Sequence, residues 1–179
     1  MAFDTFLYFP NQSLVVGESL DAEMSKKKAF EISDFSFGVE NTVNLGSGSG
    51  GAGSGKANFS EFEVNKLTDT GSCGLFATCC TGNHFDEAIV ELRRAGGSNN
   101  KSGTTFIKIH FKMVIVTEMT WNGADGEDGL NESVKFKYGA LRIEYFKQNE
   151  KGVMSKAPGG QGEAKWSQIL NEANYSVKR

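Results

Sequence analysis

The sequence predicts a mainly β protein, a compact β-barrel of two antiparallel sheets with one short flanking α-helix. First, apolar and polar residues alternate over several long runs, which is the period of a strand with one buried face. Second, the alternation changes phase inside two of these runs, as happens where a bulge or bend lets a sheet curl. The chain has 14 Phe, 22 Gly and 2 Pro, a composition that also favours sheet.

The longest alternating run extends from Phe106 to Trp121. One face of this run carries seven apolar side chains: Ile107, Ile109, Phe111, Met113, Ile115, Met119 and Trp121. The pattern predicts a long strand with this face buried. The opposite face becomes apolar at Val114 and Val116, so we expect part of it to be covered as well.

Two other runs change phase. Within residues 30–39 the apolar parity switches at Ser33–Asp34, and within residues 134–145 it switches near Gly139. A one-residue change of phase would turn apolar side chains to the wrong face unless the backbone bends there. Further strands are predicted at residues 5–9, 57–64 and 87–93.

A single short helix is predicted over Ser72–Cys80. Gly82 can end it, and either Thr70 or Ser72 can cap its start. One side of the helix is expected to face the core and to carry Leu75, Phe76 and Cys79.

Length and composition indicate one domain over residues 1–179. A net charge of −3 gives no reason to expect nucleic acid as a partner, and the basic run at residues 26–28 is expected to be solvated. The N-terminus has no basic region before Pro10, and no apolar stretch is long enough to span a membrane. We therefore expect a chain without a signal peptide or membrane insertion, made in the cytoplasm. Three Cys do not fit a complete disulfide framework.

Residues Gly50–Lys56 have the spacing Gly-x-x-x-x-Gly-Lys of a phosphate loop. The next residue, Ala57, lacks the hydroxyl that positions the magnesium ion. A strand-like run follows, whereas a phosphate loop is followed by a helix whose N-terminus holds the phosphate. Residues 46–51 match the dinucleotide fingerprint and fail in the same way. We interpret the stretch as a flexible Gly/Ser loop and expect no cofactor.

Cys80 and His84, with Cys79 alongside, could supply two or three metal ligands, but a structural zinc site needs four. His110 lies between two lysines, where positive charge disfavours a metal ion. The acidic turn at residues 125–128 lacks the bidentate Glu of a calcium loop. No Ser/His/Asp or Cys/His set can be assembled from the spacing. We therefore expect no metal site, no catalytic residue and no enzyme activity.

Residues Val16–Asp21 contain a Gly-Glu-Ser turn, and Phe30–Val39 contain Phe-Ser-Phe-Gly. Together they resemble the opening signature of the hemolysin-coregulated protein (Hcp) family, in which such a turn leads to an aromatic-Ser-aromatic-Gly strand. Later features follow in the family's order: the glycine loop, a helix ending in Cys79–His84, then Arg93–Gly97 and Leu130–Val134. The resemblance covers nearly the whole chain.

This resemblance implies a structural component of the bacterial type VI secretion system. Members of the family form hexameric rings that stack into the inner tube, and the lumen can carry effectors. The implied partners are further copies of the chain, type VI effectors, and sheath and spike proteins. The implied location is cytoplasmic before firing, then secreted without a signal peptide. The alternative is a ligand-binding β-sandwich, such as a carbohydrate-binding module.

Two candidate sites follow from the resemblance. By alternation Ser36 points away from the face that buries Phe35 and Phe37, and the resemblance places that surface on the inner wall of the ring, as a lumen or effector contact. The Gly/Ser-rich loop at residues 45–56 is implied to project and touch the next ring. Its candidate stacking residues are Leu45, Gly46, Gly48, Gly50, Gly51, Gly53, Gly55 and Lys56.

The C-terminal segment has two interpretations. Its apolar residues from Trp166 to Ala173 are spaced as on one face of a helix. The family would instead place its last strand near Trp166, and we favour the strand.

Overall fold

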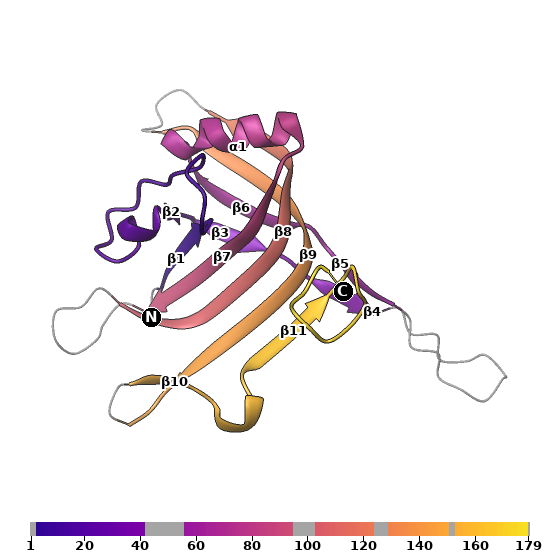
Figure 1. Cartoon of the computed structure of the whole chain (residues 1–179). Helices are drawn as coiled ribbons and strands as arrows, with labels where there is room; N and C mark the ends of the chain where they lie inside the picture. The colour runs from indigo at the N-terminus through magenta and orange to yellow at the C-terminus, as the bar shows by residue number, and fades with distance from the viewer. Residues whose placement is uncertain (1–2, 42–55, 95–102, 124–128, 151–152, 179) are drawn as a thin grey trace.

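The computed structural model describes residues 3–41, 56–94, 103–123, 129–150 and 153–178. They form a curled nine-stranded sheet and a two-stranded sheet, both antiparallel, with one α-helix at one end of the barrel (Figure 1). The predicted mainly β fold is confirmed. In chain order the elements are β1 (Phe3–Tyr8), η1 (Ser25–Lys27), β2 (Phe30–Glu31), β3 (Asp34–Ser36), β4 (Val39–Asn41), β5 (Ala57–Phe59), β6 (Phe62–Leu67), α1 (Thr70–Thr81), β7 (His84–Arg94), β8 (Thr104–Asn122), β9 (Asn131–Gln148), β10 (Met154–Lys156), η2 (Pro158–Gly160) and β11 (Glu163–Ser167).

The two ends of the large sheet meet along one segment. Strands β2 and β3 stand at opposite ends of the order β2-β1-β7-β8-β9-β6-β3, yet only Ile32 and Ser33 separate them in the chain. The N–H of Ile32 donates to the carbonyl of Thr5 (3.0 Å), and that of Ser33 donates to the carbonyl of Asn65 in β6 (2.8 Å). The predicted phase change at Ser33–Asp34 therefore lies where the chain passes from one edge of the sheet to the other.

A second phase change lies on a line across three neighbouring strands. Asp86 in β7, Met113 in β8 and Gly139 in β9 lie side by side, since the pairs that flank them are in register. At this line the buried positions change parity, in β8 from Phe111 to Val114. The switch predicted near Gly139 is confirmed, and it extends across the neighbouring strands.

The face predicted for the long strand is wrong at Met113 and Trp121, whereas Met119 packs on the core as predicted. Met113 has a φ of 53°, so the strand does not keep a strict alternation through it. As a result Met113 is 36% exposed, whereas Val114 and Val116 are buried. A register shift between Val116 and Glu118 then returns Met119 to the core, and Trp121, next to the end of the strand, is 37% exposed. A periodic pattern contains no signal for a backbone conformation that non-glycine residues rarely adopt.

The predicted helix exists, but its cap differs. Asp69 is the N-cap residue: its carboxylate accepts from the N–H of Gly71 (3.0 Å), and the hydroxyl of Ser72 accepts from the N–H of Asp69 (3.0 Å). Neither Thr70 nor Ser72 is the cap itself. Gly82 ends the helix in the left-handed conformation, as predicted. Leu75 is buried and Cys79 packs on the core.

Phe76 was predicted to face the core, but it does not. Its side chain is 52% exposed, and its ring lies 5.9 Å from that of Trp121. The single strand predicted over residues 57–64 is two strands: β5 ends at Phe59, and β6 begins at Phe62 and belongs to the other sheet. Near Trp166 the chain is a strand, β11, followed by turns, which agrees with the favoured interpretation.

The core of the barrel is rich in Phe. The ring of Phe62 stacks on Phe111 and Phe136, with centroids 4.2 and 5.5 Å apart. All three side chains are fully buried, and each buried Phe contributes about 1.5–3 kcal/mol. This core holds β6, β8 and β9 together.

Candidate functional site

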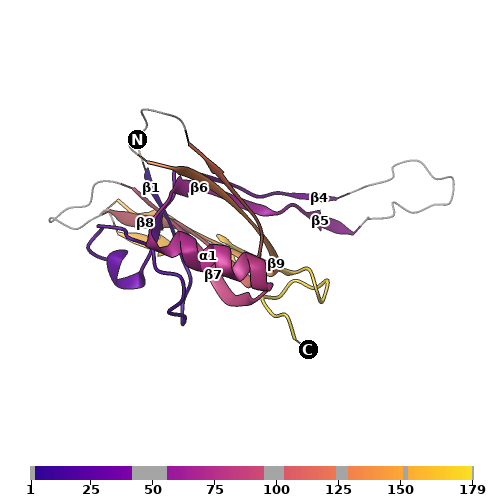
Figure 2. The same cartoon turned by 90° about the horizontal axis from the view of Figure 1, so that it is seen from above.

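The hairpin of β4 and β5 leaves the barrel wall and projects away from it (Figure 2). Val39 pairs with Phe59 and Glu40 with Asn58. The side-chain amide of Asn58 donates to the carboxylate of Glu40 (2.9 Å). Val39 is 61% exposed, so the hairpin buries little apolar surface of its own.

Aromatic contacts attach the base of this hairpin to the core. The ring of Phe59 meets that of Tyr138 edge to face at 6.4 Å. Phe37, which lies between β3 and β4, meets Phe111 in the same way at 5.7 Å. Two independent contacts at its base therefore position the hairpin on the barrel.

The glycine loop continues from this hairpin. The candidate stacking residues Leu45, Gly46, Gly48, Gly50, Gly51, Gly53 and Gly55 lie outside the described residues. Lys56 is described: it is exposed and directly precedes β5. A strand rather than a helix follows Lys56, which is the context expected for a connecting loop and not for a phosphate loop.

Ser36 is exposed in β3, while Phe35 and Phe37 are half-buried and pack on the core. The alternation predicted for this segment is therefore confirmed. Ser36 pairs with Glu63 of β6, on the outward face of the sheet.

Ser36 begins a row of outward-facing polar residues across four strands. Glu63 pairs with Lys135 of β9, and Lys135 pairs with Glu118 of β8. The ammonium of Lys135 donates to Glu118 (2.7 Å), and the hydroxyl of Ser133 donates to Glu63 (2.7 Å). This row gives the wall around Ser36 a hydrogen-bonded, charged surface.

A second polar group lies on the outward face at the other half of the wall. It contains Glu87 (β7), His110 (β8), Arg142 and Glu144 (β9) and Tyr175 of the C-terminal segment; we call it the His110 cluster. His110 Nε2 lies 2.8 Å from Glu144 and Nδ1 3.3 Å from Glu87. A hydrogen bond from His110 holds the pKa of Glu87 below its usual value, although burial acts in the opposite direction. Burial raises the pKa of Tyr175.

Sequence reasoning missed this cluster. His110 was interpreted as a strand residue among lysines, and its partners come from strands 23 to 34 residues away and from the C-terminal segment. The other histidine, His84, is exposed, as is Cys80. Within the described part of the chain, His, Cys, Asp and Glu form no group of three or more suited to a metal ion.

The basic run at residues 26–28 was expected to be solvated, but it is not fully solvated. Lys27 donates to Glu91 (2.7 Å), and its ammonium lies 4.8 Å from the centre of the Tyr8 ring. Glu91 is 2% exposed and also accepts from the hydroxyl of Tyr8 (3.1 Å). The run therefore attaches the η1 segment to the outward face of β1 and β7.

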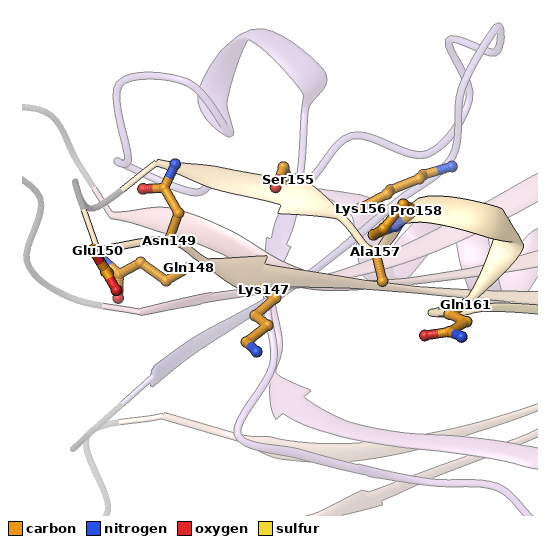
Figure 3. Close-up of a pocket in the computed structure, with 9 residues that line it drawn as sticks. All are labelled: Lys147, Gln148, Asn149, Glu150, Ser155, Lys156, Ala157, Pro158 and Gln161. Atoms are coloured by element: carbon orange, nitrogen blue, oxygen red, sulfur yellow. The ribbon is translucent and has the colours of Figure 1, made fainter.

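A hollow of about 780 Å³ lies between the end of β9 and the β10–η2 segment (Figure 3). It is lined by Lys147, Gln148, Asn149, Glu150, Ser155, Lys156, Ala157, Pro158 and Gln161. Lys147 and Lys156 extend to opposite sides of the ribbon (Figure 3), and Lys156 is bonded to Glu144 and Glu163. The polar groups do not converge, so this hollow lacks the arrangement expected of a ligand site.

The fold itself defines the class of protein. Residues 6–145 match the family model of the type VI secretion system effector Hcp. A solved structure of a type six secretion system protein superposes with a TM-score of 0.81 at 29% identity, covering 96% of this chain and 99% of that one. Hcp1 from Salmonella typhimurium superposes with a TM-score of 0.71 at 23% identity, covering 97% of this chain and 100% of that one. The chain is a β-barrel protein of type VI secretion systems.

The particular family follows from the extent of the match, 6–145 of 179 residues: the chain belongs to the Hcp family. Protein hcp1 of Pseudomonas aeruginosa is 28% identical over 103 residues, which is 58% of this chain and 62% of that protein. The aligned region therefore spans less than two thirds of that relative. Among the described residues, no helix combines the length and the apolar character needed to cross a bilayer.

Proposed function

We propose that the chain is a structural subunit and not an enzyme. It assembles into hexameric rings that stack into the inner tube of the type VI secretion system, and it is secreted without a signal peptide from its initial place in the cytoplasm. The observation that carries this proposal is membership of the Hcp family over residues 6–145, together with a superposition at a TM-score of 0.81 over 96% of the chain.

The sheet edges support a ring. In the described residues, β3 ends the strand order, and β11 pairs with β9 along one side only, apart from a bridge between Ser167 and Glu172. Edges of this kind must be covered, closed or paired. A closed ring with heterologous contacts covers them without continuing into an open fibre.

The partners of this subunit are further copies of itself, type VI effectors carried in the lumen, and the sheath and spike proteins. The polar row that begins at Ser36 is the surface we assign to the lumen. The hairpin of β4 and β5, which carries the glycine loop, is the surface we assign to contact between rings.

Light scattering coupled to size-exclusion chromatography tests the assembly. The expected mass is six times the chain mass of 19.4 kDa. A monomer or dimer at micromolar concentration would contradict the tube subunit and favour a ligand-binding β-sandwich. Calorimetric titration with glycans would then distinguish the two functions, because a carbohydrate-binding module would bind glycans and a tube subunit would not.

A further inference from the structure

The outer side of α1 does not have the composition of a helix that faces water. The helix reads TGSCGLFATCCT and contains no charged side chain. Its exposed residues are Thr70, Cys73, Phe76, Ala77, Cys80 and Thr81. The middle four follow the spacing i, i+3, i+4, i+7 and so lie along one face, which we call the α1 face. A surface helix ordinarily carries charged residues on its outer side, and a helix that is apolar all round is ordinarily buried. The α1 face therefore has the composition of a contact surface.

An aromatic pair stands beside the α1 face. The rings of Phe76 and Trp121 have centroids 5.9 Å apart, and the two residues are 52% and 37% exposed. The indole N–H of Trp121 donates to the carboxylate of Glu132 (2.9 Å), and Glu132 is buried. This hydrogen bond holds the indole in place before any contact with another molecule forms. Exposed aromatic side chains that are already positioned are typical of the residues that dominate binding at protein interfaces.

The residue pattern of the α1 face is complementary to itself. Consider two antiparallel α1 helices related by a twofold axis that passes between positions 76 and 77. The bulky Phe76 then lies opposite the small Ala77 of the second copy, which allows the helices to pack closely. The same register places Cys73 opposite Cys80, and the twofold axis repeats both pairs. Because α1 contains no charged side chain, the two helices bring no like charges together. These features favour a second copy of this chain as the partner.

The thiols of the α1 face can be linked to each other only between two chains. Cys73 and Cys80 are both free and exposed. Seven residues of α-helix separate them by about 10.5 Å along the axis, whereas a disulfide needs Cα atoms about 4.4–6.8 Å apart. A link between these two residues therefore reports the antiparallel register directly. Cys79 is half-buried and packs on the core, so it lies outside the α1 face.

We propose that the α1 face is a homotypic contact surface, on which α1 of a second copy packs antiparallel with Phe76 opposite Ala77 and Cys73 opposite Cys80. This contact differs from the hairpin and the polar row that we assign to ring stacking and to the lumen. It joins two units, whether a unit is one chain or a ring, and so does not depend on the hexamer.

A disulfide oxidant, such as oxidised glutathione, can lock the contact. The thiolate of Cys73 attacks the oxidant and releases one glutathione thiolate. The thiolate of Cys80 in the second copy then attacks the Cys73 sulfur of this mixed disulfide and releases the second glutathione thiolate. Each link oxidises two protein thiols and reduces one glutathione disulfide to two thiols.

Oxidative cross-linking tests the register. The purified chain is treated with oxidised glutathione, denatured and separated by electrophoresis without reductant. In the wild-type protein we expect a band of two chains and none larger, because a twofold contact closes on itself, and peptide mapping should find Cys73 joined to Cys80. Cys73→Ser and Cys80→Ser should each abolish the band, since every link needs one thiol of each kind. Cys79→Ser is the matched control and should keep the band.

Two outcomes of this experiment would overturn the proposed register. A link from Cys80 to Cys80 that persists in Cys73→Ser would show that the thiols meet by random collision. A ladder of species larger than two chains would show a head-to-tail contact in place of the twofold one.

Light scattering in the presence of reductant tests the contact without the disulfide. The mass of the unit, one chain or six, should double as the concentration rises. Phe76→Asp should abolish the doubling, because it places a charge on the α1 face. Val153→Asp is the control: Val153 is 57% exposed and directly precedes β10, at the opposite end of the barrel from α1 (Figure 1), so this variant should still double. A wild-type mass that does not double would overturn the proposal, whether or not the hexamer forms.

Discussion

Met113 and Gly139 face each other across β8 and β9, and a Cβ built on Gly139 would lie 3.4 Å from the Cβ of Met113. Met113 has a positive φ, and both residues lie on the line where the buried face changes parity. Gly139 also lies directly beneath the C-terminal segment, residues 168–178, which we call the strap. Gly139 therefore lies both at the bend of the barrel wall and in the contact between the wall and the strap.

Gly139→Ala should destabilise the protein. The new methyl group would lie 2.7 Å from a methyl of Ile169 and 2.9 Å from one of Val177, so the strap must shift. Overpacking of this kind costs about 1–3 kcal/mol, and the urea midpoint should fall accordingly. Gly38→Ala is the control, because its Cβ would meet only the hydroxyl of Ser60, at an ordinary 3.4 Å. An equal fall of the urea midpoint in the two variants would show that the strap does not pack tightly on Gly139.

The buried ion pair of Lys66 and Glu132 gives a second prediction. Their charged atoms are 2.7 Å apart, and neither side chain is more than 1% exposed. Glu132→Gln leaves the Lys66 charge without its principal partner and should lower the free energy of unfolding by about 3–5 kcal/mol. Glu118→Gln removes an exposed partner of Lys135 and should cost at most about 1 kcal/mol. A small loss in Glu132→Gln would mean that Lys66 is satisfied by Asp69 and Ser72 alone.

Local chemistry explains which parts of the fold could be predicted. Alternation identified the long strand, and the phase changes at Ser33–Asp34 and Gly139 indicated where the sheet bends. The predicted face of β8 was wrong at Met113 because this residue adopts a positive φ that its residue type does not suggest. The helix cap was missed because Asp69 precedes the predicted start, although Asp is a strong N-cap residue.

Acid should destabilise the protein partly through Glu91. Burial alone would raise the pKa of this carboxylate, but hydrogen bonds from Lys27 and Thr105 hold it below its usual value of about 4.5. A lowered folded pKa contributes stability that is complete above the unfolded value and is lost as the pH falls through the folded one. The free energy of unfolding, measured by urea from pH 7 downward, should therefore fall below about pH 4.5. Glu91→Gln should flatten that decline and Lys27→Met should give an intermediate slope; an unchanged slope in Glu91→Gln would exclude Glu91 as a cause.

The candidate sites differ in how much of each could be predicted from the sequence. The outward orientation of Ser36 could be predicted, because Ser36 alternates with two Phe side chains that pack on the core. The His110 cluster could not be predicted in this way, because β7, β8, β9 and the C-terminal segment each contribute residues to it. Local sequence patterns carry no information on contacts between residues so far apart in the chain. Lys27 was missed for the same reason, since Glu91 lies 64 residues away.

Ser36→Gln tests the lumen surface. Ser36 is exposed and begins the polar row, so a longer side chain there should leave the fold and the hexamer intact. It should reduce co-purification or stability of a cognate effector, since it narrows the space beside the wall. Lys165→Gln, which changes an exposed residue of β11, is the control. Unchanged effector levels in an intact Ser36→Gln hexamer would remove Ser36 from the lumen surface.

Shortening the glycine loop tests the contact between rings. Removal of residues 48–54 should leave the fold and the hexamer intact, because Phe37 and Phe59 attach the base of the hairpin to Phe111 and Tyr138. Glycine and serine lose much entropy when ordered, so each loop should form only a weak contact. In the proposed hexameric ring, six such contacts would act together at one ring interface, so stacking could be cooperative without any strong pair. We therefore expect ring stacking and secretion to be abolished while light scattering still gives the hexamer mass. Tubes of the shortened protein under the electron microscope would show that the loop is only a connector.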